Sequence, residues 1–123
     1  MAVDYKGPYV LDREVVTEKV PEEKGNYLFL RKETDSYTVG YVGRSEKNLR
    51  QEILQQMGTY RANHCTHFVY ALANTVRETF ETECREYHKY GGKEKLNNRY
   101  HPDQPAGHNY PCPEEGCEYN EED

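Results

Sequence analysis

The chain has 123 residues, enough for one domain, and only 35% of them are hydrophobic, with a mean hydropathy of −1.12. The twelve tyrosines add ring area that can be buried, so we expect a folded domain with a small core. No apolar run is long enough to span a membrane, and the N-terminus lacks a signal-peptide core. These features exclude an integral membrane protein and predict a soluble, cytoplasmic one.

The net charge of −6 comes from the C-terminal end. The last 13 residues, PCPEEGCEYNEED, hold six of the 22 acidic residues and none of the 16 basic ones, so the rest of the chain is neutral. Proteins that bind DNA mainly by neutralising phosphates usually carry a basic excess, so the charge disfavours tight non-specific binding. The acidic end is either simply solvated or a contact for a basic protein partner.

Strand-like runs dominate the first half of the chain. Residues 1–24 are rich in turns and are predicted to form an N-terminal extension with room for one short strand. Residues 26–32 and 36–43 are rich in β-branched and aromatic residues, and the short polar turn between them predicts an antiparallel hairpin. A third strand is predicted at 64–72.

Two helices complete the predicted domain. Apolar residues at helical spacing predict one helix over 48–57 and another over about 75–90. The order β-β-α-β-α predicts an α+β core over 25–92, built as a small three-stranded antiparallel sheet flanked by helices. Residues 93–123 contain four of the six prolines and no sustained periodicity, so this tail is either disordered or held by something other than a core.

Cysteine and histidine spacing suggests how the tail is held. Cys84 and His88 lie four apart on the predicted helix, about 40° apart around its axis, so both can face one atom. Cys112 and Cys117 form a C-x4-C pair in the tail. Together these residues predict a structural Zn²⁺ site that staples the tail to the helix, with His101 as an alternative fourth ligand.

Each proposed zinc ligand can also be interpreted without a metal. Cys84 lies on the apolar stripe of its helix and can be a core residue, as we expect for Cys65 in its strand. A lone helix histidine is usually at the surface, and the tail cysteines can be free thiols. A disulfide is disfavoured because nothing in the sequence indicates export.

Two short motifs carry a resemblance to a known family. Gly25-Asn26-Tyr27 lies on the first strand of the hairpin and Tyr41-Val42-Gly43 on the second, followed by Arg44-Ser45 and a helix that contains Asn48-Leu49. In this order the motifs resemble those of the GIY-YIG nucleases. Residues 78–92 look like the family segment that supplies a metal-binding glutamate.

The tail extends the resemblance. Residues 96–113, LNNRYHPDQPAGHNYPCP, look like a branch of small bacterial and phage proteins in which the GIY-YIG core runs into an HP…CP segment. The resemblance covers roughly residues 25–117. It implies a GIY-YIG fold and a divalent-metal-dependent endonuclease that hydrolyses DNA phosphodiester bonds.

The resemblance also implies roles for particular residues. Tyr27 or Tyr41 would act on the nucleophilic water, and Glu83 would hold Mg²⁺ or Mn²⁺. Glu83 is one residue before Cys84, so one helix can face the active site and the zinc site. Arg44 and Arg61 are the candidates for binding substrate.

One departure from the family pattern bears on catalysis. Family members place an arginine two or three residues after the leucine that corresponds to Leu49, and here those positions are Gln51 and Glu52. Arg50 is the remaining catalytic candidate, although one helical step turns it by about 100°. A glutamate would repel a phosphate. The alternative function is therefore a GIY-YIG domain without catalysis that binds nucleic acid or protein.

Overall fold

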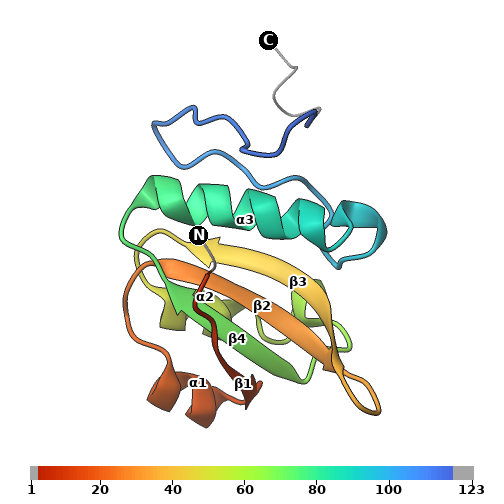
Figure 1. The fold of residues 1–123 in the computed structure, drawn as a ribbon. Coiled ribbons are helices and arrows are strands. Elements are labelled where there is room, and N and C mark those ends of the chain that lie inside the picture. Colours follow the sequence, from red (N-terminus) through yellow and green to blue (C-terminus); the bar gives the residue numbers. More distant parts are fainter. Residues whose placement is uncertain (1–2, 118–123) are drawn as a thin grey trace.

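The computed structural model describes residues 3–117, which form an antiparallel sheet with helices on both faces (Figure 1). The strands are β1 (Lys6–Val10), β2 (Gly25–Lys32), β3 (Tyr37–Ser45) and β4 (His67–Leu72). The helices are α1 (Arg13–Lys19), α2 (Leu49–Gln56) and α3 (Val76–Lys89), with short 3-10 turns η1 (Tyr60–Ala62) and η2 (Gly92–Glu94). None of the helices in residues 3–117 has the length and apolar character needed to cross a membrane.

The sheet has the strand order β1-β4-β2-β3, and every neighbouring pair is antiparallel. The predicted α+β class and the β2–β3 hairpin are confirmed, but the sheet has four strands where three were predicted. The fourth, β1, comes from the N-terminal extension and pairs with β4. Only Tyr9 of β1 is partly buried, so this strand has no alternating pattern for the sequence to reveal.

Alternate residues of β2 point to two separate cores. Tyr27 and Phe29 pack with residues of α1 and α2 on one face of the sheet, where Val16 and Ile53 are fully buried. The other face, which carries Leu28 and Leu30 among others, lies beneath α3 (Figure 1). Because β2 is the central strand between β3 and β4, it is buried over Gly25–Leu30.

The C-terminal segment, residues 95–117, contains no helix or strand and runs along the side of α3 that faces away from the sheet (Figure 1). Its first part is tied to β3, because the Asn97 backbone N–H donates to the Gly40 carbonyl and the Asn98 side chain pairs with Val42. Its later part packs Cys112 and Cys117 against the outer face of α3.

Candidate functional site

The two motifs of the hairpin meet across the β2–β3 pair, where Tyr27 lies opposite Gly43. The Tyr27 ring covers Gly43 so closely that a Cβ at this position would collide with the ring. Glycine is therefore the residue that fits there. The Tyr27 hydroxyl donates a hydrogen bond to Glu52 Oε2 at 2.9 Å. Burial, then the charge of Glu52, raise the pKa of Tyr27 well above its usual value.

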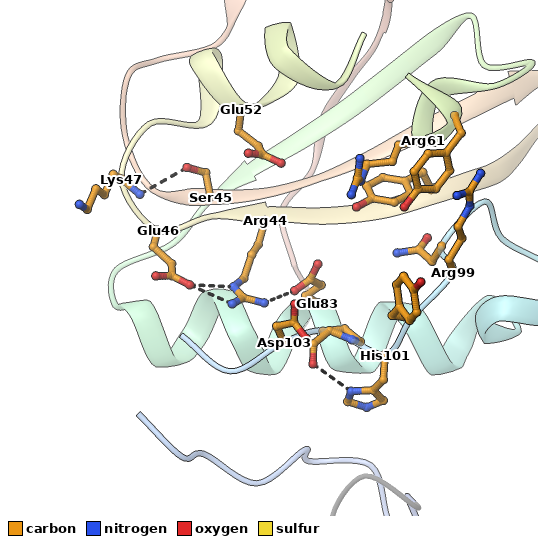
Figure 2. Close-up of a pocket in the computed structure, with 15 residues that line it drawn as sticks. Arg44, Ser45, Glu46, Lys47, Glu52, Arg61, Glu83, Arg99, His101 and Asp103 are labelled. Atoms are coloured by element: carbon orange, nitrogen blue, oxygen red, sulfur yellow. Dashed lines mark hydrogen bonds and ion pairs between the residues drawn. The ribbon is translucent and has the colours of Figure 1, made fainter. Parts of the chain in front are cut away.

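A cavity of about 420 Å³ opens beside this motif, where strand β3, helices α2 and α3, turn η1 and the C-terminal segment meet (Figure 2). Its lining is rich in charged and aromatic groups from all five elements. They include Tyr41, Arg44, Glu52, Arg61, Glu83, Arg99 and Asp103. Four predicted site residues, Tyr41, Arg44, Arg61 and Glu83, are thus brought to one cavity, while Tyr27 lies behind it and reaches it through Glu52.

Arg44 and Glu83 form a nearly buried ion pair in the middle of the cavity (Figure 2). The Arg44 guanidinium donates from Nη1 to Glu83 Oε1 and from Nε and Nη2 to Glu46 Oε2, at 3.2 Å and 2.9 Å for the latter two. Burial raises the pKa of Glu83 to about 7, with Arg44 acting in the opposite direction. The carboxylate is thus oriented by Arg44 and able to titrate near neutral pH.

Tyr41 reaches the same cavity from β3. Burial and the charge of Glu83 raise the pKa of Tyr41 to about 12, while Arg61 lowers it through its charge and a hydrogen bond. The phenol is therefore protonated at neutral pH and can donate a hydrogen bond. Arg61 is the neighbouring group that would stabilise a phenolate if the proton were lost.

Arg50, predicted as a catalytic candidate, lies outside the cavity. Its Nε donates to the Val20 carbonyl at 2.7 Å and its Nη1 pairs with Glu22 at 3.3 Å, so it fastens α2 to the chain that follows α1. Its helix turns it away from the cavity, as the 100° step implies. From α2 the cavity receives a carboxylate, Glu52, and no arginine.

A second cluster lies on the outer side of α3. The ligand atoms of His88, His101, Cys112 and Cys117 lie within 4.8 Å of one another. The Nε2 atoms of the two histidines are 3.3 Å apart, and His101 Nε2 is 3.4 Å from Cys117 Sγ. A tetrahedral Zn²⁺ with bonds of about 2.05 Å to nitrogen and 2.3 Å to sulfur would separate these atoms by about 3.3 Å and 3.6 Å. These two distances match a tetrahedral metal site, so the group could hold a metal ion.

His101 is also oriented as a metal ligand would be. Its Nδ1 lies 3.0 Å from the Pro102 carbonyl, which can only accept, so Nδ1 carries the proton and Nε2 presents a lone pair to the cluster. Cys84, predicted as a ligand, lies outside the four-residue group. It is fully buried against Phe80 and Cys112, and burial raises the pKa of its thiol. Cys84 thus lies beside the group, in contact with Cys112, whereas His101, the alternative ligand, lies within it.

Several residues of the cavity were not anticipated from the sequence. Tyr60, Asn98, Arg99 and Asp103 line it, although they belong to no motif and lie on a turn or in the irregular segment. The resemblance of the tail included the run NNRYHPD, but it did not assign a role to any residue of that run. The acidic end was expected to be either solvated or a contact for a protein partner, and its residues 118–123 lie outside the described part of the chain.

Comparisons with known proteins bear on the fold. No protein-family model and no curated protein matches the sequence. Solved structures do match, and they are three point mutants of the GIY-YIG N-terminal endonuclease domain of UvrC from Thermotoga maritima, each bound to its catalytic divalent cation. They are 21–23% identical to this chain, with TM-scores of 0.51–0.52.

The match extends over most of both molecules. It covers 68% of this chain and 94–97% of the solved domains, so nearly the whole of each domain has a counterpart here. The hairpin with its two motifs, the following helix and the glutamate-bearing α3 are in the order that the resemblance implies. The chain therefore has the GIY-YIG endonuclease fold.

Proposed function

We propose that this protein is a metal-dependent endonuclease that hydrolyses DNA phosphodiester bonds. The observation that carries the proposal is the convergence of Tyr41, Arg44, Arg61 and Glu83 on one cavity within a GIY-YIG fold. An oxygen ligand for a metal, a hydrogen-bond donor and positive charge are groups that can promote hydrolysis of a phosphodiester. The solved UvrC domains hold a catalytic divalent cation, which supports the same chemistry here.

Glu83 is the residue best suited to bind the divalent cation. Its carboxylate lies in the cavity, is oriented by Arg44, and offers the hard oxygen that Mg²⁺ or Mn²⁺ prefers. A divalent cation bound there would stabilise charge on the phosphate and lower the pKa of a bound water. Tyr41, which is protonated at neutral pH, would donate a hydrogen bond to the water or to a phosphate oxygen, and Arg61 beside it would stabilise negative charge there.

The proposal is tested by plasmid nicking with Mg²⁺ or Mn²⁺. We expect Glu83→Ala to lower the nicking rate at least about a hundredfold, because a lost metal ligand removes several kcal/mol of transition-state stabilisation. Glu81→Ala is the matched control, since Glu81 is on the same helix but pairs with Arg77 and Arg85 outside the cavity. Equal rates for wild type and Glu83→Ala, or no activity in either, would rule out the enzyme.

Binding of nucleic acid without cleavage is the second candidate, and one observation favours it. Glu52 lies in the cavity, accepts a hydrogen bond from Tyr27, and occupies the helix position where the family places arginine. A carboxylate there repels the phosphate that the catalytic group should hold. Salt-dependent DNA binding by wild-type protein that shows no nicking would support this function over the first.

We also propose that His88, His101, Cys112 and Cys117 bind a structural Zn²⁺. A site closed by four protein ligands leaves no position for substrate, so its role would be to hold the C-terminal segment on α3. Metal analysis of the purified protein is the test, and we expect one equivalent of zinc per chain. Clearly less than one equivalent after refolding with zinc would argue against the site.

A further inference from the structure

The charges that line the cavity are not equally available to a substrate. Glu46, Glu52, Glu83 and Asp103 supply four carboxylates, which would repel an approaching phosphodiester. The positive groups on the lining are Arg44, Lys47, Arg61 and Arg99. Which of these cations can meet a phosphate depends on the partners that each already has.

Two of the four cations are poorly placed. Arg44 is engaged by both Glu46 and Glu83, so its charge is balanced inside the protein. Lys47 is exposed, and its side chain points away from the cavity (Figure 2). Helix α2 contributes only Glu52 to the cavity lining, because Arg50 is turned toward Val20 and Glu22. Positive charge for a phosphate must therefore come from the remaining two arginines.

Arg61 and Arg99 have no carboxylate partner among residues 3–117. Arg61 contacts neutral groups, the amide oxygen of Gln56 at 3.3 Å and the phenol of Tyr41. The Arg99 side chain is exposed, and its guanidinium carbon lies 3.7 Å from the centroid of the Tyr60 ring. Arg61 stacks on the same ring at 4.6 Å. Figure 2 shows the two side chains on one side of the cavity, apart from Arg44.

The segment that carries Arg99 is fixed on both sides of it. Just before it, the buried Asn98 side chain accepts from Val42 N at 3.0 Å and donates to Val42 O at 2.9 Å. Asn97 donates to the carbonyls of Arg61 and Asn63. Two residues after Arg99, His101 enters the cysteine and histidine cluster. The two arginines therefore come from separate parts of the chain that are bonded to each other.

We propose that Arg61 and Arg99, aligned on the Tyr60 ring, bind the phosphate of the nucleic-acid substrate in place of an arginine from α2, whose Arg50 is turned away from the cavity. Each guanidinium offers paired N–H donors that match two phosphate oxygens, and stacking holds the planar group in one orientation. This inference rests on the proposed function, because it assigns a phosphodiester to the cavity. It gives the C-terminal segment a direct part in substrate binding.

The test is the salt dependence of DNA binding. A short fluorescein-labelled DNA duplex is titrated with protein at about 50 to 200 mM salt, without added divalent metal and without a chelator. We expect Arg99→Ala and Arg61→Ala each to weaken binding about tenfold, as for one lost charged hydrogen bond. Each should reduce the slope of log K against log salt by about one, and the double variant by about two.

Controls separate a phosphate contact from a structural role. Arg85→Ala removes an exposed arginine of α3 that lines no part of this cavity, and it should leave affinity and slope unchanged. Arg99→Lys should keep the slope and lose part of the affinity, because the point charge remains without the paired donors. Melting temperatures of all variants show whether the fold is intact. An unchanged slope in folded Arg99→Ala protein would overturn the proposal.

The outcomes also distinguish this inference from the proposed function. If wild-type protein nicks DNA but Arg99→Ala binds with an unchanged slope, the nuclease proposal is supported and phosphate binding by the arginine pair is wrong. If wild-type protein binds DNA with an Arg99-dependent slope and never nicks it, phosphate binding by the arginine pair is supported and the nuclease proposal is wrong. If wild-type protein binds no DNA at all, both are wrong.

Discussion

The four-stranded sheet and the C-terminal segment of residues 95–117 are held by different kinds of interaction. The sheet is stabilised by apolar burial, with Phe29, Phe68 and Ile53 fully excluded from solvent. The segment has no helix or strand. It buries a few apolar side chains, such as Leu96 and Pro105, and is otherwise held by the side chains of Asn97 and Asn98 and by the cysteine and histidine cluster.

This difference matters because the candidate site lies where the two regions meet. Tyr41 and Arg44 come from β3, whereas Arg99 and Asp103 come from the C-terminal segment. Apolar packing is spread over many contacts, so a single substitution removes only part of the stabilisation. A segment held by few contacts depends more on each of them, and it can detach while the sheet remains folded.

The largest effect on the segment is expected from Cys112→Ser, which removes one ligand of the proposed zinc site. Cys112 is buried and in contact with Cys84 and the outer face of α3. We expect loss of bound zinc and a decrease in the free energy of unfolding of about 3 kcal/mol, since metal binding is coupled to folding. Metal analysis, thermal melting and limited proteolysis of the C-terminal segment measure the effect.

Two variants make this result specific. Cys65→Ser changes a cysteine outside the cluster, so zinc content should stay at one equivalent and the stability should change by less than about 1 kcal/mol. Phe68→Ala opens a cavity in the core and should destabilise the sheet by about 3–5 kcal/mol with its zinc ligands intact. If Cys112→Ser kept its zinc and its melting temperature, the cluster would not be what holds the segment.

A smaller effect is expected at the joint between the two regions. Asn98→Ala leaves the N–H and C=O of Val42 without the partners that the buried amide supplies. We expect a loss of about 2 kcal/mol in the free energy of unfolding, as for buried backbone groups that lose their hydrogen bonds. Urea denaturation measures it, with Asn109→Ala, at an exposed position of the same segment, as the control. Equal stability of the two variants would mean that Asn98 does not join the regions.

The same division explains how much could be predicted from the sequence. The hairpin, β4, α2 and α3 have local patterns of apolar residues, so their positions follow from periodicity. β1 has no such pattern because only Tyr9 is partly buried, and α1 buries Val16 within just seven residues. Room for one short strand in residues 1–24 was predicted, but its place in the sheet therefore was not, and α1 was missed.

The cavity was predictable mainly where a motif marked it, and Arg61 is the exception. Tyr41 and Glu83 were identified through the family-like motifs, and both line the cavity. Asn98 bonds to Val42, 56 residues away, and a side-chain contact of that length leaves no trace in local sequence. Cys84 has the correct helical spacing from His88 and lies against Cys112, but spacing alone does not show whether its buried thiol binds a metal or only packs in the core.

The smallest predicted effect, taken per unit of pH, tests whether Glu83 is a metal ligand, through its titration. Burial raises the pKa of Glu83 from 4.5 to about 7; Arg44 lowers it, and Glu52 and Asp103 raise it further. Below about pH 7 the folded protein holds a proton that a divalent cation must displace. We therefore expect the affinity for Mn²⁺ to rise about tenfold per pH unit up to about pH 7, a change of about 1.4 kcal/mol per unit, and then to level off.

The sign of the accompanying stability change follows from the same pKa. Between pH 4.5 and about 7 the unfolded chain has lost the Glu83 proton while the folded protein keeps it, so this group's contribution to stability falls as the pH rises. Glu83→Gln cannot ionise, so its stability should fall less steeply over this range and its Mn²⁺ binding should lose the pH dependence. Free Mn²⁺ measured by electron paramagnetic resonance gives the affinities. A wild-type affinity that is independent of pH, or that matches Glu83→Gln throughout, would place the cation elsewhere in the cavity.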